Sequence, residues 1–143
     1  MGQLPSGLPD QIADDEDLAR FLIQSNQFND TMVKPAAFLP SPKERETSVS
    51  RHGAEPIQQL WELGLVAAGI RTLYGAAIFK AKAVRDARLE VLPAEPPPRH
   101  AVILGWSWLY DDPDLQKARQ KELAVLLAST AGKPLLRQTD VAR

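Results

Sequence analysis

The chain has 143 residues, of which 44% are hydrophobic and 24% are charged, a size and composition typical of one globular domain with its own core. It contains no cysteine, which excludes disulfide bonds, thiolate catalysis and zinc sites built on cysteine. With 17 Lys and Arg against 18 Asp and Glu, the net charge is −1. This balance excludes a global field that would draw the protein to nucleic acid or to an anionic membrane.

The N-terminal region divides into a tail and an apolar segment. Residues 1–12 contain prolines and glycines without a hydrophobic period, a pattern typical of a flexible tail. The acidic run 14–17 then precedes a segment in which Leu18, Phe21 and Leu22 have the spacing of one helical face. Acidic side chains favour the N-terminus of a helix. The sequence therefore predicts a short helix here, rather than a metal site built from the acids.

Residues 46–52 alternate in a way that predicts a β-strand. The alternation puts Arg51 on one face with a valine and a threonine. It puts His52 on the other face, together with Ser48 and Ser50. This polar face either meets water or lines a site.

Five further elements are expected in the middle of the chain, from apolar spacings and from the positions of proline and glycine. They are an extended segment over 33–40, a helix over 56–63, a strand over 71–79, a short helix over 80–88 and a strand over 89–93.

The C-terminal third begins with three prolines, 96–98, which lead into an apolar strand that ends near residue 106. Asp112 is the expected N-cap of a helix that starts at a proline and covers 113–131. A glycine follows this helix, as expected at a helix C-terminus. Residues 133–143 are expected to form a tail.

Along the chain, the predicted strands occur in groups and do not alternate strictly with long helices. This order predicts an α+β fold. We expect a small antiparallel or mixed sheet with two or three packed helices, the last of them the long helix 113–131. The domain is expected to span 13–132, between tails at 1–12 and 133–143. No apolar run has the length of a membrane span, and the N-terminus does not have a secretory pattern. A cytoplasmic location is therefore expected, and the content of alanine and arginine suggests a bacterial origin.

Two Arg-His dipeptides, Arg51-His52 and Arg99-His100, give the one catalytic hypothesis. If they share a site, the two histidines are candidate catalytic residues as general acid and base, and the two arginines are candidate anion-binding residues. Neighbouring residues on a strand point to opposite faces, however, so an irregularity is needed to bring all four together. The favoured alternative is that each dipeptide is a polar strand end bonded to a carboxylate or to water.

Three aromatic side chains, Trp106, Trp108 and Tyr110, lie close together in the sequence. They are candidate partner-binding residues, because exposed aromatics often anchor protein interfaces. Packing in the core is the favoured alternative. The acidic pair 111–112 that follows them disfavours a platform for nucleic-acid bases.

The sequence has no phosphate-binding loop, no dinucleotide fingerprint and no nucleophile elbow. The leading hypothesis is a protein-binding or accessory module without catalytic activity, which needs no cofactor and no metal and contacts a protein partner or a second copy of itself. One alternative is a small enzyme that acts on a phosphate-containing or nucleotide substrate through the two Arg-His pairs. A second alternative is a nucleic-acid-binding protein, which requires one basic patch in which Lys34 or Arg71 is joined by Lys80, Lys82, Arg85 and Arg88. No membrane partner is expected.

Overall fold

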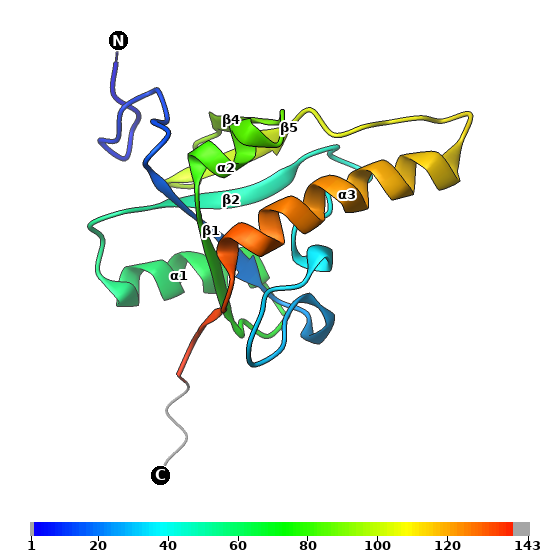
Figure 1. Ribbon diagram of the computed structural model, residues 1–143. Coiled ribbons are helices and arrows are strands. Elements are labelled where there is room, and N and C mark those ends of the chain that lie inside the picture. The colour runs from blue at the N-terminus through cyan, green and yellow to red at the C-terminus, as the bar shows by residue number, and fades with distance from the viewer. Residues whose placement is uncertain (1, 139–143) are drawn as a thin grey trace.

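The computed structural model describes residues 2–138 and has an α+β fold, which confirms the expected fold class (Figure 1). All strand pairs of its six-stranded sheet are antiparallel, in the order β4-β5-β2-β1-β3-β6. The strands are β1 (Asp17–Leu22), β2 (Thr47–His52), β3 (Gly75–Lys80), β4 (Glu90–Pro93), β5 (His100–Leu104) and β6 (Leu135–Leu136). The helices are α1 (Ile57–Ala68), α2 (Ala81–Asp86) and α3 (Pro113–Ala131).

The predicted helix over Leu18–Ile23 is wrong, because this segment is the strand β1, which pairs with both β2 and β3. Leu18 and Leu22 are buried on one face of the sheet, and Ala19 and Phe21 are buried on the other. A strand that is buried on both faces loses the alternation of apolar and polar residues. Its apolar positions then imitate a helical period.

Helix α3 has the predicted bounds, and Asp112 caps it by accepting a hydrogen bond from the backbone N–H of Leu115 at 3.0 Å. Helix α1 runs five residues beyond its predicted end near residue 63. Gly64, which suggested that end, is a buried residue of the helix. A Cβ atom there would lie 2.8 Å from side-chain carbons of Phe21 and Leu73. The glycine is therefore required for close packing and does not end the helix.

The sheet has a core on each face. The larger core lies between the sheet and α2, α3 and the 3₁₀ turn Pro35–Ala37, and the smaller one lies under α1. In Figure 1, α1 and α3 accordingly lie on different sides of the sheet. The 3₁₀ turn corrects the expected extended segment over 33–40. Its proline occupies the first helical position, where the missing N–H costs nothing, and Phe38 behind it is fully buried.

Both terminal segments contact the sheet. Backbone carbonyls of Pro9 and Gln11 accept hydrogen bonds from the Arg51 guanidinium, and Ser6 bonds to Glu95. The short strand β6 pairs with β3. Whether residues 1–12 and 133–143 are flexible stays a prediction, and residues 139–143 lie outside the described part of the chain.

One part of the molecule projects from the sheet, and we call it the arm (residues 107–123). It consists of the N-terminal half of α3 and the extended segment before it, which lie side by side beyond the strands (Figure 1). Gln120 ties the two together by donating a hydrogen bond to the carbonyl of Ser107 at 2.6 Å. No side chain of the arm is buried. Among residues 2–138, no helix combines the length and the apolar character of a membrane span.

Candidate functional site

Arg51 is fully buried in β2, and its guanidinium is committed to structural partners. It forms an ion pair with Glu16, in which Nε faces one carboxylate oxygen and Nη2 donates to the other at 2.9 Å. Nη1 donates to the Pro9 carbonyl at 2.6 Å, and Nη2 also donates to the Gln11 carbonyl at 3.3 Å. These contacts hold the N-terminal segment against the sheet, which favours a structural role for this arginine.

Glu55 binds one member of each Arg-His pair, His52 and Arg99. Its carboxylate is 2% exposed and accepts from Arg99 Nη2 at 3.0 Å, from His52 Nδ1 at 3.0 Å and from the Gly53 N–H at 2.6 Å. Burial by itself raises the pKa of Glu55, but the hydrogen bonds from Gly53 and His52, with the charge of Arg99, hold the pKa below its ordinary value. The carboxylate is therefore ionised and anchors the turn after β2.

The two histidines lie on the same face of adjacent strands but have different partners. Ser50 is the cross-strand partner of His100, and His52 follows Ser50 by two residues. His52 bonds to Glu55, whereas His100 donates from Nδ1 to the Ala94 carbonyl at 2.9 Å. The catalytic roles of His52 and His100 and the anion-binding roles of Arg51 and Arg99 stay predictions. Three of these residues, Arg51, His52 and Arg99, bond to carboxylates, which is the kind of contact that the favoured alternative of polar strand ends predicts.

A groove of about 760 Å³, which we call the Ser50 groove, opens on the α1 side of the sheet. Strand β2 contributes Ser48 and Ser50, and β5 contributes His100. The polar face that the sequence predicted either to meet water or to line a site therefore lines this groove. His52, on the same face, is not among its lining residues. The remaining wall includes apolar side chains of β1 and α1, the turn at Pro97 and Pro98, and residues of the segment 39–46.

Ser50 is the distinctive residue of the groove. It is 4% exposed, and its hydroxyl is the one buried side-chain polar atom without a hydrogen-bond partner among residues 2–138. Leaving a buried hydroxyl without a partner costs about 1–3 kcal/mol. Such an atom in a native fold calls for a specific explanation. A polar atom of a ligand in the groove would satisfy it once the hydroxyl, which is itself shielded from solvent, turned towards the groove.

His100, the cross-strand partner of Ser50, also lines the groove. Because a carbonyl only accepts hydrogen bonds, the contact with Ala94 fixes the hydrogen of the neutral imidazole on Nδ1. Nε2 is then an acceptor, and it has no hydrogen-bond partner among the described residues. Directly opposed residues on antiparallel strands have Cβ atoms about 4.5–5.5 Å apart. The two side chains therefore start close together in the groove wall, within the span of one small ligand.

The charges around the groove balance. Arg20 and Arg71 line it together with Glu44 and Glu46. Arg20 donates to the carbonyls of Ala37 at 2.7 Å and Ser48 at 2.9 Å, just beyond the last residue pair of β1 and β2. Burial lowers the pKa of Arg20 to about 10, so the guanidinium keeps its charge at neutral pH. With two charges of each sign, the rim favours neither an anion nor a cation.

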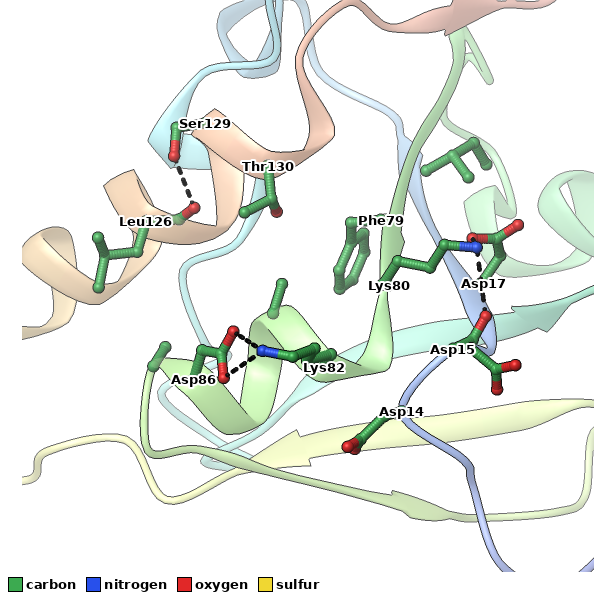
Figure 2. Close-up of a pocket in the computed structure, with 13 residues that line it drawn as sticks. Asp14, Asp15, Asp17, Phe79, Lys80, Lys82, Asp86, Leu126, Ser129 and Thr130 are labelled. Carbon is green, nitrogen blue, oxygen red and sulfur yellow. Dashed lines mark hydrogen bonds and ion pairs between the residues drawn. The ribbon is translucent and has the colours of Figure 1, made fainter.

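A second hollow, of about 720 Å³, lies between α2 and α3, and two residues of the expected basic patch, Lys80 and Lys82, line it (Figure 2). Lys80 pairs with Asp17 at 2.9 Å and Lys82 with Asp86 at 2.8 Å, and Figure 2 shows acidic side chains interleaved with these lysines. Arg85 pairs with a further acid at 2.6 Å. This neutralisation disfavours a phosphate-binding surface. Within the described range, no group of three or more acidic or histidine side chains is placed to hold a metal ion.

The three aromatic candidates have different environments. Trp106 is 4% exposed and donates from Nε1 to the Ile103 carbonyl at 3.2 Å, which places it in the core and removes it from the surface. Trp108 is partly buried against the same core, and Tyr110 is 71% exposed. The guanidinium of Arg45 lies 5.1 Å from the ring centre of Trp108 and 5.4 Å from that of Tyr110. Of the three, Tyr110 is the residue most available to a partner.

Comparisons with known proteins found no match among protein-family models, curated proteins or solved structures. Sequence reasoning placed Ser50 on the correct face but did not single it out, although strand alternation was the signal for it. It missed Glu55, for which the sequence has no periodic signal because its partners come from the end of β2, the turn after it and the distant turn before β5.

Proposed function

We propose that the protein is a small-molecule-binding module, and that the Ser50 groove holds an uncharged amphipathic ligand through a carboxamide-like group. The observation that carries this proposal is the buried, unpartnered Ser50 hydroxyl in the wall of an open groove. The groove also has the character of a ligand site, with mainly apolar walls and a small number of polar groups that set the orientation of the ligand.

The polar recognition is a matched pair of hydrogen bonds. The Ser50 hydroxyl donates to a ligand carbonyl, and His100 Nε2 accepts from the ligand N–H. A primary carboxamide or a lactam carries one acceptor beside one donor, which complements this pair. A ketone or an ester has the acceptor alone and leaves Nε2 without a partner.

The walls and the rim support an uncharged ligand with an apolar body. Phe21, Leu63 and Val66 offer apolar surface beside the two polar atoms. A ligand with a net charge would gain no net attraction from this rim, because repulsion by the charges of one sign offsets attraction by the charges of the other.

The test compares two probes of the same size, benzamide and acetophenone, by titration calorimetry against the full chain. Benzamide should bind more tightly, and Ser50→Ala should weaken its binding by roughly 2- to 10-fold, the effect of one neutral hydrogen bond. Ser25→Ala, at an exposed serine that does not line the groove, should change nothing. Equal binding of both probes, with no effect of Ser50→Ala, would contradict the proposal.

No contact favours the phosphate-directed enzyme over this proposal. The guanidinium groups of Arg51 and Arg99 already bind carboxylates and carbonyls. An anion would have to displace those partners before it was bound.

A further inference from the structure

Helix α3 has apolar residues on two opposite sides. Ala124, Leu127 and Ala128 are buried against the sheet. On the other side, Leu115 and Leu126 are 41% and 49% exposed. Because the helix advances about 100° per residue, a helix buried on one side alone is expected to carry polar residues on the other. The second apolar side is therefore a feature that the monomer does not explain.

The exposed side forms a narrow stripe, which we call the α3 stripe (Leu115, Arg119, Glu122 and Leu126). Its four residues fall within an arc of about 60° around the helix axis, almost opposite to the buried side. They are spaced alternately by four and three residues, the spacing of a helix that packs along another helix. Leu115, Arg119 and Glu122 belong to the arm, which projects beyond the strands (Figure 1).

The stripe is complementary to itself when it is reversed. Leu115 and Leu126 lie equally far from the point between Gln120 and Lys121, and Arg119 and Glu122 also lie equally far from that point. A second α3 that runs antiparallel therefore sets each leucine against a leucine of the other copy. It also sets each arginine against a glutamate. A contact that follows two-fold symmetry requires this kind of self-complementarity.

We propose that the protein forms a homodimer through antiparallel packing of the α3 stripes of two copies. A surface hollow of about 530 Å³ supports this geometry, because it is lined by Leu115, Arg119, Glu122 and Leu123. Leu126 of the partner subunit enters this hollow beside Leu115. The lysines at 117 and 121 lie more than a quarter turn from the stripe, so no like charges meet.

The same pairing explains the exposure of Tyr110. By the symmetry of the pairing, Tyr110 of one copy reaches the end of the partner's α3. There the hollow between α2 and α3 begins at Leu126, Ser129 and Thr130 (Figure 2). The interface thus extends beyond the stripe at both ends.

The test exchanges charges within the stripe and measures association by sedimentation equilibrium, at concentrations up to about 1 mM. Arg119→Glu gives a stripe with two acids, and Glu122→Arg gives a stripe with two bases. Each single variant should dimerise roughly 10-fold more weakly than the wild type, or worse, because two ion pairs become two repulsions by symmetry. An equimolar mixture of the two variants should form a heterodimer, since every acid then meets a base.

The double variant Arg119→Glu/Glu122→Arg should restore the homodimer. Circular dichroism should show unchanged helix content in all variants, because both side chains are exposed. A wild type that stays monomeric at the highest concentration would overturn the proposal. So would single variants that associate as well as the wild type, or a mixture that does not associate better than its components.

Discussion

At the scale of single residues, Arg51 shows how a charge is kept inside this fold. Its guanidinium is fully buried and is bonded to one carboxylate and two carbonyls. Removing one partner of a buried ion pair leaves the others desolvated and unpaired, which costs more than the pair itself contributes. The stability of the N-terminal segment therefore depends on this one side chain.

We predict that Arg51→Met lowers the free energy of unfolding by about 3–5 kcal/mol, as measured by urea denaturation. The matched control is His52→Ala on the next residue, where the side chain is 20% exposed and its partner Glu55 keeps Arg99. The control should lose less than about 1.5 kcal/mol. An Arg51→Met variant as stable as the wild type would show that the ion pair is dispensable.

Ser50 and Thr47 form a natural comparison, because both carry buried hydroxyls on β2. Thr47 donates to the Phe38 carbonyl at 2.8 Å, whereas Ser50 has no partner. Thr47→Val should therefore destabilise the fold by about 1–3 kcal/mol, and Ser50→Ala should leave its stability unchanged or raise it slightly. Thermal and urea denaturation of both variants measure the difference. If Ser50→Ala lowers the stability as much as Thr47→Val does, the Ser50 hydroxyl has a structural partner. The main observation behind ligand binding in the groove would then be wrong.

Local alternation was enough to predict part of the site. It placed Ser48, Ser50 and His52 on one face of β2, which is where they lie. It did not reveal which hydroxyl lacks a partner, because that depends on packing by α1 and the proline turn. Nor did it reveal Glu55 or Glu16, whose partners are fixed by contacts between distant segments.

At the scale of elements, the central strand β1 shows where hydrophobic periodicity fails to predict secondary structure. Strand β2 and helix α3 each have one face in the larger core and were predicted with nearly correct bounds. β1 lies in the middle of the sheet with both faces covered, so its sequence carries no alternation. This segment is a strand because it pairs with β2 and β3, and local periodicity does not reveal that pairing.

Gly64 links α1 to β1 through close packing. A methyl group at this position would lie 2.8 Å from carbons of Phe21 and Leu73. We predict that Gly64→Ala destabilises the fold by about 1–3 kcal/mol through overpacking, although alanine favours a helix by about 1 kcal/mol over glycine. Leu65→Ala, at the exposed neighbour, is the control and should cost much less. A Gly64→Ala variant that gains stability would mean that α1 can move away from the sheet.

At the scale of the whole molecule, two carboxylates make the stability dependent on pH. Burial raises the pKa of Glu55 and Glu95, but their hydrogen bonds outweigh it and both pKa values lie below the ordinary 4.5. For Glu95 the donors are the hydroxyl and N–H of Ser6 and the N–H of Arg99. A carboxylate with a lowered pKa in the folded state stabilises the fold above its unfolded pKa. That contribution is lost as the pH falls through the folded value.

We therefore predict that the wild type loses stability as the pH falls from about 5 towards 3, and that Glu55→Gln flattens this dependence while being less stable at pH 7. Urea denaturation at several pH values measures both effects. Glu44→Gln, at an exposed side chain, should keep the slope of the wild type. Identical slopes for the wild type and Glu55→Gln would show that Glu55 does not couple folding to protonation.

The two proposed surfaces are compatible with each other. The Ser50 groove opens on the α1 side of the sheet, whereas α3 packs on the other side (Figure 1). Pairing of two α3 stripes therefore leaves both grooves open, and a dimer would present two independent sites. Ligand binding is not expected to depend on association.

The most direct test of the binding proposal is nitrogen NMR of the two histidine rings during titration with benzamide. Donation from the ligand should shift the Nε2 signal of His100 and the backbone amide signal of Ser50, and it should leave the ring signals of His52 in place. Ser50→Ala should reduce the shift, and acetophenone should not produce it. A titration that leaves the His100 ring unchanged, or that affects His52 in its place, would contradict the assignment of this groove as the site.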